Sequence, residues 1–167
     1  ISITGNYVNG EDVLSFVNAG NITGSFNAAS GVLTLTGADT LANYVAALQS
    51  ITYTNTSENP SGATRTVTFI ANDGTDNSLA TTRDITVAPV NDAPVVTPTV
   101  AALAYTENDG AVALDSAITV TDVDNTTLAS ATISITGNYV NGEDVLSFVN
   151  TANITGSFNA TSGVLTL

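Results

Sequence analysis

The chain has 167 residues, of which 15 are acidic and two are basic, so its formal net charge is −13. This charge disfavours binding to nucleic acid and to anionic membranes, because contacts with phosphate need Lys and Arg. The sequence contains no Cys, no His and no Lys, which excludes disulfides, thiolate zinc sites and the usual pairs of base and nucleophile. No apolar run reaches the roughly 18 residues that a membrane span needs. We therefore predict neither an enzyme nor a membrane-inserted protein.

One segment occurs twice in the sequence. Residues 1–35 and 133–167 are identical except at three positions, where Ala19, Gly20 and Ala29 are replaced by Thr151, Ala152 and Thr161. The offset of 132 residues suits a whole domain of roughly 100–150 residues better than a solenoid unit of roughly 20–50 residues. The sequence therefore indicates a tandem array with a period of 132 residues. The alternative is a recent duplication of this segment alone.

The predicted elements of the first part begin with a strand over 31–36, which follows a turn at Gly31. The stretch 37–50 is the exception to the β pattern, because its apolar residues follow helical spacing and Asp39 or Thr40 can cap the helix. These apolar residues are Leu41, Tyr44, Val45 and Leu48. Alternating apolar residues then predict strands over 50–55, 64–71 and 80–89.

A proline-rich stretch, 88–98, follows and reads as a short stiff connector. After it, apolar alternation predicts further strands, over 99–105, 111–122, 128–136, 144–149 and 154–159. Many short alternating strands separated by turn residues favour an all-β fold, an Ig-like Greek-key β-sandwich of about nine strands and one short helix. The predicted boundaries are 1–88 for the C-terminal part of one repeat, which lacks its first strands, 89–98 for the linker, and 99–167 for the N-terminal part of the next repeat, which lacks the helix and last strands.

Acidic loops of such a sandwich would gather at its two ends. The loop 121–125 should lie beside the linker that enters its repeat, and the loop 56–62 beside the linker that leaves the preceding one. The loops 72–77 and 106–110 should face the next linkers on either side. Ca²⁺ takes six to eight oxygen ligands, mostly carboxylates and carbonyls. The predicted calcium ligands are Glu58, Asp73, Asp76, Asn91, Asp92, Glu107, Asp122 and Asp124.

The alternative is that these acids only form turns, since Asp and Asn bond readily to nearby backbone N–H groups. For Asp12, Asp39 and Asp115 we prefer this second interpretation.

Three motifs in order, VNDAPVV, TENDGAV and TDVDN, resemble the cadherin-type repeat. The resemblance is greatest to the cadherin-like, bacterial Ig-like repeats of giant secreted adhesins. It implies that Asn91 and Asp92, Glu107, and Asp122 with Asp124 bind calcium between neighbouring repeats and stiffen the array. The sequence departs from the animal pattern, because no proline precedes Glu107 and the linker has fewer acids. One or two ions per linker are therefore expected.

These observations together favour a mechanical function. We expect a calcium-stiffened, extracellular spacer or fibre of a bacterial adhesin or surface filament. Its partners would be neighbouring repeats of the same polypeptide or identical neighbouring chains. The alternative is a ligand-binding adhesion module for carbohydrate, ice or a matrix protein, repeated for avidity, with Thr-rich strands such as 64–71 as its surface.

Overall fold

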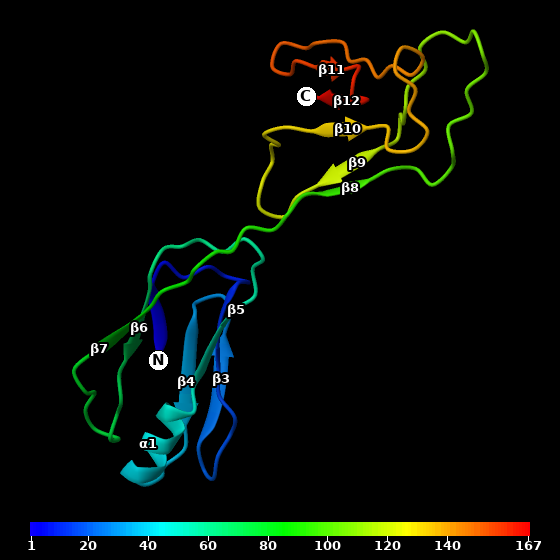
Figure 1. Cartoon of the computed structure of the whole chain (residues 1–167). Coiled ribbons are helices and arrows are strands. Elements are labelled where there is room, and N and C mark those ends of the chain that lie inside the picture. The colour runs from blue at the N-terminus through cyan, green and yellow to red at the C-terminus, as the bar shows by residue number, and fades with distance from the viewer. The chain divides into compact units, whose positions relative to one another are not determined.

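The computed structural model describes all residues from Ile1 to Leu167 and consists of twelve strands and one helix (Figure 1). The predicted all-β fold with one short helix is therefore confirmed. The chain divides into two compact units, Ile1–Asp124 and Asn125–Leu167. The boundaries of the repeats at 88 and 98 stay a prediction. No helix is both long enough and apolar enough to cross a membrane.

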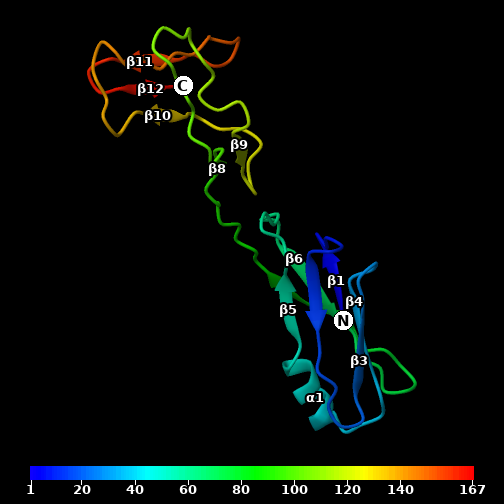
Figure 2. The ribbon, with the colours of Figure 1, turned by 90° about the vertical axis from the view of Figure 1, so that its right-hand side faces the viewer.

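The first part of the chain forms two antiparallel sheets (Figure 2). The larger sheet has the order β3-β4-β1-β6-β7 and the smaller one pairs β2 with β5. The strands are β1 (Ser2–Gly5), β2 (Asp12–Ser15), β3 (Thr23–Asn27), β4 (Val32–Thr36), β5 (Thr52–Asn55), β6 (Arg65–Phe69) and β7 (Thr81–Ile85). The predicted strands over 31–36, 50–55, 64–71 and 80–89 are thus confirmed.

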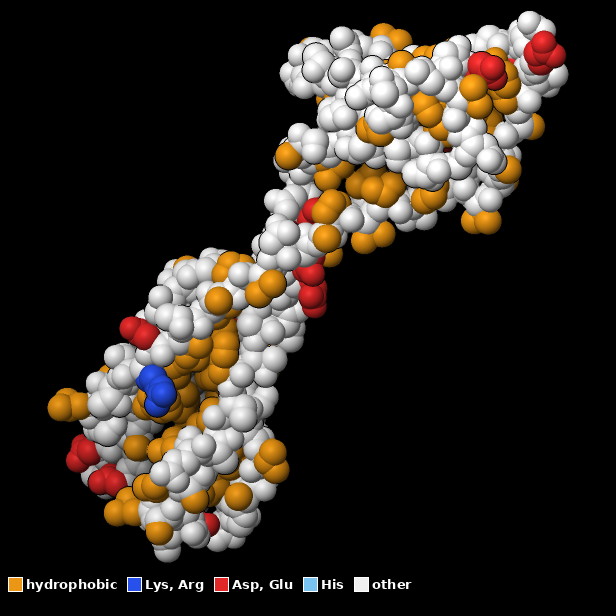
Figure 3. Space-filling view, in the orientation of Figure 1, with side chains coloured by type: hydrophobic (Ala, Val, Ile, Leu, Met, Phe, Trp, Pro, Cys, Tyr) orange, Lys and Arg blue, Asp and Glu red, His pale blue; other side chains and the backbone are white.

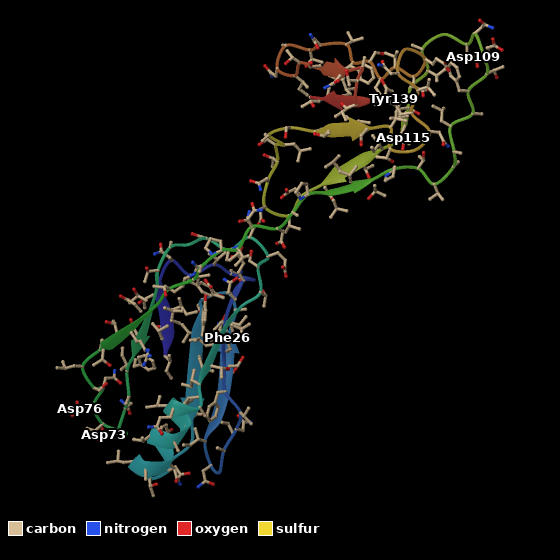
Figure 4. All side chains as sticks on the ribbon, viewed as in Figure 1. Phe26, Asp73, Asp76, Asp109, Asp115 and Tyr139 are labelled. Carbon is tan, nitrogen blue, oxygen red and sulfur yellow. The ribbon has the colours of Figure 1, made fainter.

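Both sheets contribute to one hydrophobic core. Its buried residues come from β1, β2, β4 and β6, and are Ile3, Leu14, Leu33 and Val67. Phe26 of β3 packs against them from its half-buried position (Figure 4). Each such side chain stabilises the fold by roughly 1.5–3 kcal/mol when it is fully buried. Residues 1–85 therefore have a core of their own.

A tight hairpin turn joins β3 to β4. Gly31 has a positive φ of 68°, and a Cβ at this position would lie 2.8 Å from the ring of Tyr7. The hydroxyl of Tyr7 donates a hydrogen bond to the carbonyl of Ala28 in the same turn. Only glycine meets both requirements, because it tolerates positive φ and has no Cβ.

The helix α1 (Leu41–Gln49) confirms the prediction from apolar spacing. Thr40 is its N-cap, and the Thr40 hydroxyl accepts a hydrogen bond from the backbone N–H of Asn43. The apolar face, however, is largely uncovered. Leu41 is 88% and Val45 is 52% exposed, and Ala47 is the one buried residue of the helix.

The segment after β7 differs from the prediction. The strands here are β8 (Val95–Thr97) and β9 (Thr119–Thr121), which pair with each other. The predicted linker, 89–98, therefore contains a strand. The predicted strand over 99–105 is wrong, because this stretch forms no ladder. Its three alanines disfavour a strand, whereas the β-branched pair Val95–Val96 favours one.

The second unit forms a three-stranded sheet with the order β10-β12-β11. Its strands are β10 (Thr132–Ser134), β11 (Ser157–Asn159) and β12 (Val164–Thr166). The predicted strand over 144–149 is wrong, although the identical residues 12–15 form β2 in the first copy. The reason is the partner. β2 pairs with β5, whereas no strand of the structure pairs with residues 144–149.

Candidate functional site

Three acidic residues meet where the linker passes the turn after β9. The backbone N–H of Asp92 donates a hydrogen bond to the carboxylate of Asp124. The backbone N–H of Asp124 in turn donates to the carboxylate of Asp122, at 2.9 Å. The linker and the loop 121–125 are therefore in direct contact.

The loop 56–62 reaches the same place. The side-chain amide of Asn59 donates a hydrogen bond of 3.2 Å to the backbone carbonyl of Asp124. Gly62 of the same loop lies against the ring of Pro89 in the linker. The loop that carries Glu58 is thus placed where the sequence predicts it, although the Glu58 side chain itself makes no hydrogen bond or ion pair.

Asp73 and Asp76 lie elsewhere, at the tip of the β6–β7 hairpin (Figure 4). The Asp73 carboxylate accepts hydrogen bonds of 2.9 Å from the N–H groups of Thr75 and Asp76. The bond from Asp76, and then that from Thr75, lowers the pKa of Asp73. Here the carboxylate of Asp73 stabilises the turn.

Glu107 is also not brought to the linker acids. It lies in a turn closed by the Asp109 carboxylate, which accepts a hydrogen bond of 3.1 Å from the Thr106 N–H. Figure 4 shows Asp109 at the tip of this loop.

The structure contains no group of three or more acidic side chains placed to hold a metal ion. The carboxylates of Asp122 and Asp124, in the loop 121–125, instead accept hydrogen bonds from backbone N–H groups. The donor types nevertheless fit a hard cation, because carboxylate, amide and carbonyl oxygens are the ligands that Ca²⁺ takes. The calcium site stays a prediction on these residues, with Asn91 and Asp92 supplied by the linker.

Asp39 and Asp115, which we expect from the sequence to form turns, do so in the structure. The Asp39 carboxylate accepts hydrogen bonds from the Thr40 N–H, at 2.8 Å, and from the Asn43 side chain, at 2.6 Å, at the start of α1. The Asp115 carboxylate accepts from the N–H groups of Thr99 and Ala117, at 2.7 and 2.9 Å (Figure 4).

For Asp12 the same interpretation is wrong. Asp12 is fully buried and forms an ion pair with Arg65, which is also fully buried. The Arg65 Nε lies 3.2 Å from each carboxylate oxygen. The Tyr53 hydroxyl, at 2.6 Å, the Asn55 side-chain amide, at 2.8 Å, and the Val8 N–H, at 2.8 Å, complete the bonds to the carboxylate.

This cluster joins β2, β5 and β6. Burial acts to raise the pKa of Asp12, but hydrogen bonds from Tyr53, Val8, Asn55 and Arg65 outweigh it and hold that pKa below its usual value. One nitrogen of Arg65, Nη2, is buried without a hydrogen-bond partner. A sequence signal for the cluster exists, because Asp12 stands two residues before Leu14 and so shares its inward face.

The comparisons with known proteins find no match. No protein-family model, no curated protein and no solved structure matches the chain.

Proposed function

We propose that the chain is a structural repeat of an extracellular bacterial adhesin or surface filament, with a cadherin-like Greek-key sandwich as its unit, and that calcium at the linker stiffens it. The observation that carries this proposal is the meeting of the linker with two loops: Asp92 with the 121–125 turn, and that turn with Asn59. A cation bound there would fix the linker against both loops.

The residues that would hold Ca²⁺ are Asp92, Asp122 and Asp124, with Asn91 and Glu58 beside them. The ion would supply charge neutralisation where the carboxylates are close, and no chemical step. Asp73, Asp76 and Glu107 would serve equivalent sites at the neighbouring linkers of an array.

The composition supports a mechanical role. A spacer needs length and stiffness, but it does not need its units to differ from one another. Near-identical neighbouring repeats are therefore suited to this role. The outward Thr residues form hydrogen bonds with one another, such as Thr4 with Thr68 at 2.8 Å and Thr23 with Thr36 at 3.1 Å. These pairs stabilise neighbouring strands, so the structural role is favoured over a Thr-based ligand surface.

The test is a thermal melt of the 167-residue chain with calcium and with excess chelator. We expect a higher melting temperature with calcium, because a ligand at 100 times its Kd adds about 2.7 kcal/mol to the stability. Asp92→Asn with Asp124→Asn should abolish the rise. The matched control is Asp39→Asn with Asp144→Asn, which removes the same charge at two acids that accept local backbone hydrogen bonds and are not proposed ligands, and it should keep the rise.

Solution scattering of a three-repeat protein provides the second readout. We expect a straight rod with calcium and a more compact, flexible particle in chelator. If neither the melting temperature nor the scattering curve changes with calcium, the proposal is contradicted and these acids only form turns.

A further inference from the structure

An apolar groove remains open on the 1–85 part of the chain. Its volume is about 550 Å³, and Figure 3 shows hydrophobic side chains exposed in a hollow beside a basic one. Side chains from α1, β5, β6 and β7 line it, among them Val45, Leu48, Tyr53, Phe69, Arg83 and Ile85. Exposed apolar area of this kind marks an interaction surface.

The backbone around this groove is also incomplete. β5 pairs only with β2, and β7 is the last strand of the five-stranded sheet. Both strands therefore present N–H and C=O groups that no strand pairs with. Unpaired edges next to an apolar groove are suited to an added β-strand.

The internal repeat indicates which strands belong there. The second copy, 133–167, is preceded by the segment 95–132, whereas the first copy is followed by 36–88. The segment 95–132 therefore leads into the second copy, and the segment 36–88 continues from the first copy. A unit with both halves would place the strands of 95–121 next to the elements that line the groove.

The segment 95–121 itself has apolar side chains to bury. β8 and β9 form an isolated two-stranded ribbon, and such a ribbon is marginally stable in water. Val95 is 59%, Ile118 is 49% and Val120 is 43% exposed. Ile118 and Val120 share one face because they alternate with Thr119.

Charge also favours this pairing. Arg83 lines the groove, is exposed and makes no ion pair, while the only other basic residue, Arg65, is already paired with Asp12. The segment contains no basic residue and carries Asp115 three positions before Ile118. An acidic segment that enters the groove would approach the unpaired cation.

We propose that the groove binds residues 95–121 of a second copy of this chain. Each chain has one groove and one such segment, which are different surfaces. Contacts of this kind are head-to-tail, and when they do not close into a ring they produce an open filament. The contact needs no calcium and goes beyond the function proposed above.

The test is sedimentation velocity of the whole chain over a range of concentrations, in chelator. We expect the mass to rise with concentration beyond that of a dimer. A groove variant, Val45→Glu with Arg83→Glu, and a segment variant, Ile118→Asp with Val120→Asp, should each weaken the association at least about a hundredfold, because charges would be buried without partners. The side chains of all four substituted residues are exposed, so the fold should persist.

The matched controls are Leu79→Glu, which is exposed outside the groove, and Thr119→Asp on the opposite face of β9. Both should assemble as the wild type does. A mixture of the groove variant and the segment variant should form a dimer and nothing larger, since only one intact groove and one intact segment remain.

Three results would overturn the proposal. These are a wild-type chain that stays monomeric, variants that assemble normally, and a mixture that forms no dimer. Because calcium is absent throughout, these results are separate from the failure of the calcium proposal.

Discussion

The two copies of the repeated segment, 1–35 and 133–167, fold to different extents although they differ at three positions. Both keep the same strand register, with Ser2 opposite Val32 in the first copy and Ser134 opposite Val164 in the second. The burial of equivalent side chains, however, differs between the copies. Ile22 is 1% exposed and its counterpart Ile154 is 47% exposed.

The difference lies in what surrounds each copy. The local ladder needs only partners from within the segment, and so it forms twice. The strand 12–15 pairs with β5, whereas no strand of the structure pairs with residues 144–147. The same amino acids therefore give a strand or an irregular stretch according to the elements that are available to pair with them, because β-structure depends on its neighbours more than on intrinsic preference.

The largest expected effect comes from giving the second copy the partner strands that surround the first copy. Extension of the chain after Leu167 by the sequence of residues 36–88 would provide equivalents of α1, β5, β6 and β7. We expect a second cooperative unfolding transition of about 5–15 kcal/mol, the ordinary range for a domain.

Hydrogen exchange would measure this change directly. The amides of residues 144–147 should become protected in the extended chain, as those of 12–15 are expected to be in the original one. The extension also engages the segment 95–121 within its own chain, so head-to-tail assembly should be lost. Amides that still exchange freely would contradict the role of context.

The next effect distinguishes Asp12 from its counterpart Asp144. Asp12→Ala leaves the charge of Arg65 buried without its partner, which should lower the free energy of unfolding by about 3–5 kcal/mol. Asp144 accepts one hydrogen bond of 2.8 Å, from the Val140 N–H, so Asp144→Ala should cost about 0.5–1.5 kcal/mol. Urea unfolding of both variants gives the two values.

A double variant serves as the control for this comparison. Asp12→Ala with Arg65→Met removes both charges and should recover part of the loss, because no unpaired ion remains in the core. If Asp12→Ala and Asp144→Ala lower the free energy of unfolding equally, burial of the pair contributes little to stability.

The smallest expected effect is on the pH dependence of stability. The folded state holds the pKa of Asp12 below its usual value, which is about 3.9 in an unfolded chain. The stability that this adds is complete above the unfolded pKa and is lost as the pH falls through the folded one. Urea unfolding between neutral and acidic pH should therefore show a shallower acid loss for Asp12→Asn than for the wild type.

Tyr53→Phe provides the graded case, because it removes one of the hydrogen bonds that lower this pKa. Its acid dependence should lie between those of the wild type and Asp12→Asn. An acid loss that is the same in all three proteins would show that other carboxylates determine it.

Much of the fold could be predicted from local sequence patterns. The alternation of strands β4 to β7, the helical spacing before Gln49 and the turn at Gly31 depend on neighbouring residues, and each was predictable. The lost strand at 144–149 was not, because a strand there depends on a partner distant in sequence. The same applies to Asp12, whose role is determined by Arg65, 53 residues away along the chain. The contacts between the linker, the loop 121–125 and the loop 56–62 followed from the predicted order of the loops.

Burial of Arg65 has a consequence for proteases that cut after basic residues. The chain offers such enzymes only two sites. At Arg65 the backbone lies within a paired strand and the side chain is fully buried. Arg83, on the outermost strand, is the only basic side chain on the surface. Cleavage after Arg65 requires that the chain open, and its rate follows the population of the open form when reclosing is fast. Release of the peptide Thr66–Arg83 would therefore measure how often the core opens.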